Sequence, residues 1–386
     1  MDVAQEKLKS DLAQRHADHL YRSRQTIDGP QGARIIIDGK KYLNFSSNDY
    51  LGLANHPDVV KALQQGAEKY GVGSGAAHLI SGHSIAHHTL EEELADFTGR
   101  QRALLFSTGY MANLGILSSL LQKGDAIFED KLNHASMIDG GLLSGARLQR
   151  YLHTDTHHLE KKLANSSVNT KLIATDGIFS MDGDAAPLKE IAAIAKKHSA
   201  WLMVDDAHGL GVIGEQGKGT LALQNLTNND APILMGTLGK AFGTFGAFVA
   251  GDETLIETLI QKARTYIYTT ALPPAIAHAT ITSLKLVRND SWRREHLQGL
   301  INQFKQGAIQ SDLKLMQSNT AIQPMLIGNA EKTITIKHKL QEMGFIVGAI
   351  RTPTVPAGSE RLRVTLCASH QPEDVDQLID ALRQSR

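Results

Sequence analysis

Between about residues 57 and 250 the chain alternates short β-rich runs with amphipathic stretches of helical length. This alternation predicts an α/β domain with a mainly parallel sheet. The strand candidates are nearly continuous apolar runs, which suits strands that are buried on both faces. They are RALLF, DAIFED, KLIATDG, WLMVDD and PILMG. The polar segments NSSVNT and QNLTNND are expected to be surface loops, because the alternation resumes directly after each of them.

A second domain is expected after TTALPPA, residues 269–275, where paired prolines end the alternating pattern. A long helical stretch follows to about Gln310, and then come the strand-like runs AIQPMLI, GFIVGAI and RLRVTL. This order predicts a smaller C-terminal α+β domain. The expected division is an N-terminal arm at 1–45, a large domain at 46–273 and a C-terminal domain at 274–386.

The first 22 residues lack an apolar core of signal-peptide length. Leu8, Leu12 and Leu20 have helix-like spacing, so we expect an amphipathic helix in this arm. About 18 apolar residues without a charge would be needed for a membrane-spanning helix, and the chain has no such run.

The charge balance argues against two classes of partner, although it leaves a local basic patch open. Forty basic side chains balance forty acidic ones, so no net field favours nucleic acid or an anionic membrane. Because 42% of its 386 residues are apolar, the chain has enough apolar side chains for a large core and a smaller lobe. Its single cysteine, Cys367, permits no internal disulfide, which fits a reducing cytoplasm.

Two glycine-rich segments suggest nucleotide binding, but their contexts argue against it. The segment GVGSGAAH, residues 71–78, follows a helical stretch where a dinucleotide fingerprint needs a strand. The segment GTLGKA has too few residues between its glycines for a phosphate loop, and alanine stands where a magnesium-binding Ser or Thr is needed. A P-loop enzyme is therefore not expected.

Two histidine groups are candidate metal ligands. They are His83, His87 and His88, and His153, His157 and His158. No cysteine cluster or HExxH pattern accompanies either group, so surface or helix-end histidines are the favoured interpretation and no metal site is expected.

Polar residues gather where the predicted strands end. Asp205 and His208 follow WLMVD, while Thr237 and Lys240 follow PILMG. Gly109 and Tyr110 open a helix after RALLF, and a helix N-terminus suits a phosphate. Ligands bind at the carboxyl ends of strands in open α/β sheets.

This set of groups matches what pyridoxal phosphate requires. The cofactor needs a lysine amine for a Schiff base and an acid beside its pyridine nitrogen. Lysine suits the first role because its pKa falls readily with burial or nearby charge. Taken alone, Lys240 in GTLGKAFGTFG is better explained as a solvated lysine on a flexible turn, and only the other strand-end residues favour the reactive interpretation. The glycines around Lys240 would let backbone approach the cofactor.

Over nearly its whole length the sequence resembles the α-oxoamine synthases, which are fold-type I pyridoxal phosphate enzymes. The most specific segments are NFSSNDYLGL, DGIFSMDGDAAPL, VDDAHGLGVIGEQGKG, GTLGKAFG and RTPTVPAGSERLRVTL. The segments DDAHG and TVPAGSERLR resemble the branch that condenses L-alanine with a pimeloyl thioester in biotin biosynthesis. The resemblance implies a large domain with a mainly parallel sheet, a smaller C-terminal domain and an N-terminal helical arm.

The resemblance also implies a role for each matching residue. Lys240 would form the Schiff base and act as the base for the α-proton, and Asp205 would pair with the pyridinium nitrogen. His208 and Ser180 would contact the phenolic oxygen, and His134 would stack on the ring and face the substrate. The phosphate would be bound by Gly109, Tyr110 and Thr237, with Thr269 and Thr270 reaching it from the neighbouring subunit of a homodimer. The substrate-side positions are Arg22, Asn48, Thr354 and Arg363, with Arg363 the best candidate for binding the amino-acid carboxylate.

The resemblance leaves several alternatives open. A sister synthase would use glycine with acetyl-CoA or succinyl-CoA, and a protein of another class would be a non-catalytic binding module of the same fold. The carrier of the pimeloyl group is either coenzyme A or acyl carrier protein. Ala76, Ala77 and His78 stand where the family commonly has GSR, and Asp176 replaces a more usual glutamate.

Overall fold

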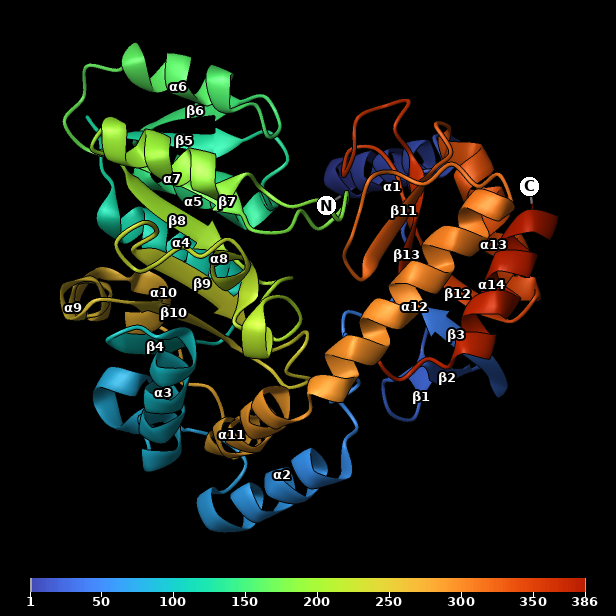
Figure 1. Cartoon of the computed structure of the whole chain (residues 1–386), viewed down its shortest axis with the longest axis horizontal. Coiled ribbons are helices and arrows are strands. Elements are labelled where there is room, and N and C mark those ends of the chain that lie inside the picture. Colours follow the sequence, from blue (N-terminus) through green and yellow to red (C-terminus); the bar gives the residue numbers. More distant parts are fainter. Residues whose placement is uncertain (1, 386) are drawn as a thin grey trace. The chain divides into compact units, whose positions relative to one another are not determined.

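The computed structural model describes residues 2–385, which form two compact units. The larger unit contains residues 51–180 and 184–294, and the smaller one contains residues 2–50, 181–183 and 295–385. The expected boundary after residue 273 differs from this division, because the helix that follows the paired prolines belongs to the larger unit. Each unit has its own sheet (Figure 1).

The larger unit is built on a seven-stranded sheet. Its strands, in spatial order, are β4 (Arg102–Phe106), β10 (Ala247–Gly251), β9 (Ile233–Thr237), β8 (Trp201–Asp205), β7 (Lys171–Asp176), β5 (Ala126–Asp130) and β6 (Arg147–Tyr151). Only β10 runs antiparallel to its neighbours, so the predicted mainly parallel sheet is confirmed. All five strand candidates of this region are strands, and β6 and β10 were not predicted.

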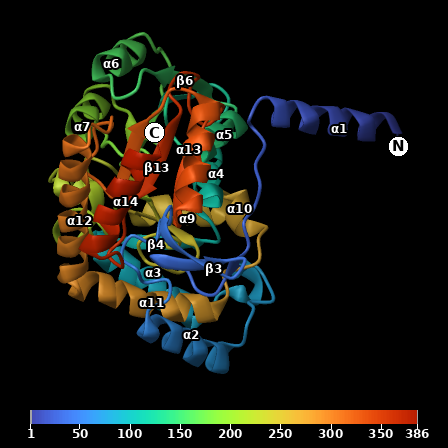
Figure 2. The same ribbon diagram turned by 90° about the vertical axis from the view of Figure 1, so that its right-hand side faces the viewer.

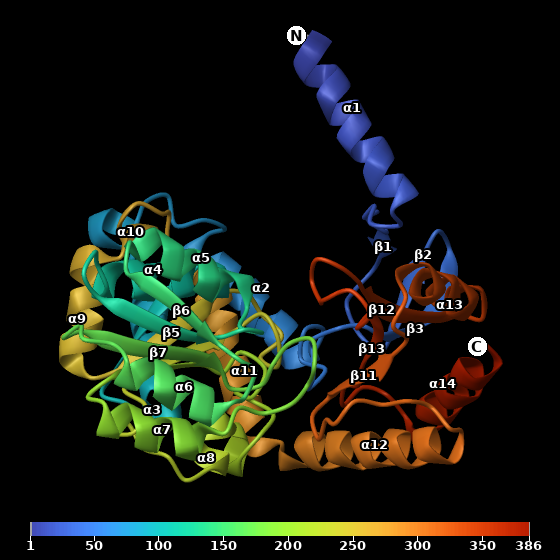
Figure 3. The same ribbon diagram turned by 90° about the horizontal axis from the view of Figure 1, so that it is seen from above.

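Helices cover both faces of this sheet, with α4 and α5 on one side and α6 and α7 on the other (Figure 3). The helices of the unit are α2 (Pro57–Tyr70), η1 (His78–Gly82), α3 (Ile85–Thr98), α4 (Gly109–Leu120), α5 (Ala135–Ser144), α6 (Thr156–Ala164), α7 (Leu188–Lys197), η2 (Glu215–Gly217), α8 (Gly219–Leu223), α9 (Glu253–Lys262), α10 (Arg264–Ile267) and α11 (Pro274–Asn289). Residues of β5, β7 and β8 are buried on both faces, as their continuous apolar sequences require.

The smaller unit contains a six-stranded sheet that joins the two ends of the chain. Its strands, in spatial order, are β1 (Ile27–Asp28), β2 (Arg34–Ile37), β3 (Lys40–Phe45), β12 (Phe345–Ile350), β13 (Arg361–Thr365) and β11 (Ile322–Leu326). The three predicted C-terminal strands are present. The N-terminal segment differs from the separate arm expected at 1–45, because β3 pairs in parallel with β12 and so belongs to the same sheet.

Helices α12 (Ser291–Gln310), α13 (Ala330–Glu342) and α14 (Pro372–Gln384) complete this unit, and α12 begins within the range of the larger one. Helix α1 (Asp2–Ala17) projects from the sheet of its unit (Figures 2 and 3). The predicted N-terminal helix is present, but its amphipathic character is not: Leu8 and Leu12 are exposed and Leu20 lies beyond its end. Across residues 2–385, no helix is both long enough and apolar enough to cross a membrane.

Candidate active site

Five parallel strands of the larger unit end at one edge of the sheet, and each end supplies a side chain to a single cavity. The cavity has a volume of about 180 Å³. It is lined by Gly109, Tyr110, Asn113, His134, Ser136, Asp176, Ser180, Asp205, Ala207, His208, Met235, Thr237 and Lys240. The carboxyl edge is where ligands bind in open α/β sheets, so the fold and the cavity agree.

Asp205 is the last residue of β8 and is buried, with an exposed fraction of 3%. The amide Nδ2 of Asn113 donates to its Oδ2 at 2.8 Å, and the Ala207 backbone N–H donates to its Oδ1 at 3.0 Å. These bonds fix the orientation of the carboxylate. A buried carboxylate in such a position suits a cationic ring nitrogen.

Lys240 follows β9 in a turn, and its Nζ lies 2.8 Å from Nε2 of His208. This contact holds the end of a flexible side chain at the cavity. The glycine-rich sequence around Lys240 therefore does not leave the lysine on an unstructured, solvated turn.

His134 lies just before α5 and accepts the Ser136 N–H at its Nδ1, at 3.3 Å. The Ser136 hydroxyl lies 2.7 Å from the same nitrogen and accepts a hydrogen bond from Asn113 Nδ2 at 2.8 Å. Asn113 therefore connects His134 with Asp205. Burial lowers the pKa of His134, an effect that the Asp205 charge opposes and the Lys240 charge reinforces.

Asp176 ends β7 beside these groups and is buried. Its Oδ2 accepts the backbone N–H of His134 at 2.9 Å. Burial raises the pKa of Asp176 well above its ordinary value, and the nearby Asp205 charge raises it further. Both effects favour the neutral form of the Asp176 carboxyl group.

Gly109 and Tyr110 begin α4 directly after the loop that follows β4. The hydroxyl of Thr108 accepts the Met111 N–H at 3.2 Å and caps the helix. The first N–H groups of a helix have no intrahelical carbonyl partner, and they carry partial positive charge. This helix N-terminus at the cavity suits an anionic phosphate.

The cavity brings together most of the residues predicted for the cofactor. Those that line it are Gly109, Tyr110, His134, Ser180, Asp205, His208, Thr237 and Lys240. Thr269 and Thr270 are not among its lining residues, and Thr270 instead forms a bridge with Ala77. Asn113 and Ser136 were missed, although Asn113 lies one helical turn after Gly109 and Ser136 lies two residues after His134.

Two predicted substrate-side residues meet in the smaller unit. Nη2 of Arg363 donates to Oδ1 of Asn48 at 3.2 Å, and Nη1 donates to Oγ1 of Thr365 at 2.9 Å. The Thr354 N–H donates to the Arg351 carbonyl at 2.9 Å, and Arg22 is exposed. Burial lowers the pKa of Arg351, and the charge of Arg22 lowers it further, so Arg22 and Thr354 both lie near Arg351.

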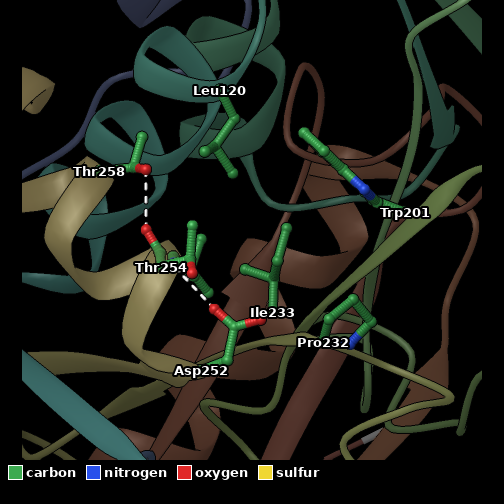
Figure 4. Close-up of a pocket in the computed structure, with 8 residues that line it drawn as sticks. Leu120, Trp201, Pro232, Ile233, Asp252, Thr254 and Thr258 are labelled. Atoms are coloured by element: carbon green, nitrogen blue, oxygen red, sulfur yellow. Dashed lines mark hydrogen bonds between the residues drawn. The ribbon is translucent and has the colours of Figure 1, made fainter.

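A second cavity of about 170 Å³ lies where β8 and β9 begin, at the opposite ends of these strands from the first one (Figure 4). It is lined by Leu120, Trp201, Pro232, Ile233, Asp252, Thr254, Leu255 and Thr258. Its acid, Asp252, already caps α9 by accepting the Leu255 N–H. Most of this lining is apolar, and it offers no pair of groups suited to acid–base chemistry.

Comparison of the sequence with known proteins gives one family match and several relatives that share the same name. Residues 40–382 match the aminotransferase class I and II family. The 8-amino-7-oxononanoate synthase of Saccharophagus degradans is 58% identical over 380 residues, covering 98% of this chain and 96% of that protein. The enzyme of the same name from Nitrosococcus oceani is 59% identical over 374 residues, covering 97% and 99%.

Solved structures show the same similarity in three dimensions. The serine palmitoyltransferase of Sphingomonas wittichii superposes with a TM-score of 0.94 at 32% identity, covering 98% of this chain and 97% of that one. The 8-amino-7-oxononanoate synthase of Francisella tularensis gives a TM-score of 0.78 at 36% identity, covering 89% and 97%. A further serine palmitoyltransferase structure, described as having a pyridoxal phosphate internal aldimine, gives a TM-score of 0.90 at 31% identity, covering 99% and 95%.

Proposed function

The chain belongs to the aminotransferase class I and II family and, within it, to the 8-amino-7-oxononanoate synthases, and from this membership we propose that it condenses L-alanine with a pimeloyl thioester. The products would be 8-amino-7-oxononanoate, carbon dioxide and the free thiol carrier. This is a carbon–carbon bond-forming acyl transfer in biotin biosynthesis.

The cofactor of this reaction is pyridoxal 5′-phosphate, and the cavity has the groups that it needs. Lys240 would bind its aldehyde carbon, Asp205 would pair with its ring nitrogen, and His134 would lie against the ring. The N-terminus of α4 at Gly109 and Tyr110, with Thr237, would bind the phosphate. When bound, the cofactor supplies an electron sink for the carbanion at the α-carbon of the amino acid.

Lys240 and Asp205 then carry the protein's part of the chemistry. We assign Lys240 Nζ as the base that takes the α-proton of alanine and later returns a proton to the product. The contact with His208 at 2.8 Å keeps that nitrogen at the cavity. Asp205, held by Asn113 and the Ala207 N–H, keeps a proton on the cofactor nitrogen.

The substrate-side residues support recognition of an amino acid. A guanidinium binds a carboxylate through two parallel hydrogen bonds, so Arg363 would bind the carboxylate of alanine, with Asn48 orienting its Nη2. We also propose that Arg22 and Thr354 contact the pimeloyl thioester. On the family resemblance alone we also propose a homodimer, in which Thr269 and Thr270 would reach the phosphate of the neighbouring subunit.

The observation that carries the cofactor assignment is the convergence of Lys240, Asp205, His134 and the α4 N-terminus on one cavity. Borohydride treatment of the protein loaded with pyridoxal phosphate should attach the cofactor to Lys240, as read by peptide mass. Attachment to another lysine, or a protein that stays colourless with the cofactor, would overturn the assignment.

The substrate assignment is tested by thiol release at equal substrate concentrations. L-alanine with pimeloyl-CoA should react faster than glycine with acetyl-CoA or succinyl-CoA. Weak glycine binding would be compatible with the proposal, because a pocket distinguishes one methylene by only about 1–3 kcal/mol. A glycine pair that is faster by a wide margin would replace the alanine assignment and leave the cofactor roles unchanged.

A further inference from the structure

Residues 78–91 gather four histidines and a carboxylate at one place in the larger unit, separate from the cofactor cavity. His78 and His83 come from η1 and the loop after it, and His87, His88 and Glu91 come from α3. The sequence favoured surface or helix-end histidines here. The fold nevertheless brings His83 close to the rings of His78, His87 and His88, and gathers His83, His88 and the Glu91 carboxylate into one group.

His87 is already fully used by the protein. Its Nδ1 accepts the Ser84 N–H at 3.0 Å, which caps α3, and its Nε2 donates to the Leu272 carbonyl at 2.5 Å. His87 is completely buried, so both bonds would be costly to break. This histidine is therefore a structural residue.

His83, His88 and Glu91 are arranged differently from His87. One ligand atom each from His83, His88 and Glu91 lies within 4.8 Å of the others. Glu91 uses Oε1 to accept the Leu105 N–H at 2.9 Å, while Oε2 lies 3.9 Å from Nε2 of His83. The side chain of Glu91 is only 12% exposed, and no lysine or arginine of residues 2–385 forms an ion pair with it.

From this geometry we propose that His83, His88 and Glu91 form a binding site for a divalent transition-metal ion such as Zn²⁺. Two imidazoles and one carboxylate are a common protein ligand set for zinc, with water in the fourth position. Metal–ligand distances are about 2.0–2.2 Å. His88, whose side chain is 59% exposed, can rotate from its 3.4 Å contact with Glu92 to complete the set.

His78 has the position of a supporting residue. Its Nδ1 lies 2.9 Å from Nδ1 of His83, a contact in which one ring donates and the other accepts. If Nδ1 of His83 donates, Nε2 of His83 carries the lone pair that a metal needs, and metal-bound histidines commonly donate their second N–H in this way. The ring of His78 is itself fixed by stacking on Tyr266 at a centroid distance of 5.0 Å.

Zn²⁺ titration of the untagged, cofactor-loaded protein by calorimetry tests this proposal, after chelator treatment and desalting. We expect saturable binding with one ion per chain. His88→Gln and Glu91→Gln should each weaken the Zn²⁺ affinity by at least about tenfold. Both variants should fold, because His88 is exposed and the amide oxygen of a glutamine in place of Glu91 can still accept the Leu105 N–H.

His157→Gln is the matched control, since His157 is an exposed histidine of the other group and should leave Zn²⁺ affinity unchanged. His78→Phe should weaken binding about tenfold, and His78→Gln should restore part of it because an amide oxygen can accept from His83. The absence of saturable binding, or equal effects of His88→Gln and His157→Gln, would overturn the site. Loss of binding only in His87→Gln would also overturn this ligand set.

Discussion

The two units of the chain supply functional residues in different ways. In the larger unit, five parallel strands end at one edge, so side chains that lie far apart in sequence converge on one cavity. In the smaller unit, the proposed substrate-side residues come from an exposed segment at Arg22, a turn at Thr354 and the antiparallel strand β13. The cofactor groups are therefore held by a hydrogen-bond network within one unit, whereas the substrate groups depend on several separate segments.

The largest effect should come from breaking the network at Asp205. Asp205→Asn should bind the cofactor but lose more than about tenfold in turnover, or about 1.4 kcal/mol of barrier, because an amide cannot hold the ring nitrogen protonated. Carbon dioxide release from alanine and a pimeloyl thioester measures the loss.

Asp206 is the matched control for Asp205. It is buried next to Asp205, but its Oδ2 accepts the Thr220 N–H, and it does not line the cavity. Burial raises the pKa of Asp206 to about 7, so a neutral amide is a modest change at this position. Asp206→Asn should therefore keep most of the turnover. Equal losses in the two variants would show that Asp205 acts only through general stability.

The next largest effect concerns the substrate side. Arg363→Lys should raise the KM for alanine by about tenfold, because an ammonium group cannot make the two parallel bonds of a guanidinium. Turnover at saturating alanine should change less. The comparison variant is Arg361→Lys, since Arg361 lies on the same strand and pairs with Asp182 at 2.7 Å. That change should lower the melting temperature and leave KM nearly constant; the reverse pattern would exclude Arg363 as the carboxylate-binding residue.

The difference between the two units also explains which parts of the fold and of the site could be predicted from the sequence. Buried parallel strands are continuous apolar runs, so their ends, and with them Asp205 and Lys240, could be located directly. Strand β6, with the sequence RLQRY, was missed because it is a partly exposed edge strand with polar residues. The N-terminal strands were assigned to a separate arm because the β3–β12 pairing joins residues about 300 positions apart, which local patterns do not reveal.

Side-chain networks were harder to predict than strand ends. Asn113 joins Asp205 to Ser136, but a helical asparagine in sequence gives no sign of its two partners. In the same way, the spacing of His83, His88 and Glu91 in the sequence does not reveal that the folded chain brings His83 close to the two residues of α3. Both depend on tertiary packing.

A smaller effect should appear at a separate ion-paired histidine of the larger unit. His153 lies 2.9 Å from carboxylate oxygens of both Asp130 and Asp184. Burial lowers the pKa of His153, but its hydrogen bonds with these two acids outweigh burial and raise the pKa to about 10. An unfolded histidine has a pKa of about 6.5. The resulting stability is therefore fully present below about pH 6.5 and is lost as the pH rises toward 10.

His153→Gln should lower the melting temperature by about 2–4 °C at pH 6. The difference from the unsubstituted protein should shrink toward pH 10, because His153 then loses its proton in the folded state. Thermal unfolding at several pH values measures this. His157→Gln, on the neighbouring exposed helix position, should show no such pH dependence. A difference that stays constant from pH 6 to pH 10 would argue against an ion pair.

The smallest effect on turnover should follow Asp176→Glu, which introduces the residue more usual in the family. Oδ2 of Asp176 accepts the His134 N–H at 2.9 Å, and a glutamate can keep this bond if its extra methylene finds room at the cavity wall. An added methylene in a packed region typically costs about 1–3 kcal/mol of stability. Because glutamate carries the same carboxyl group as aspartate, the substitution keeps an acid at this position. We therefore expect turnover to stay within about tenfold, as measured by thiol release, together with a lower melting temperature. A larger loss of turnover than that of Asp205→Asn would instead assign Asp176 a direct part in the reaction.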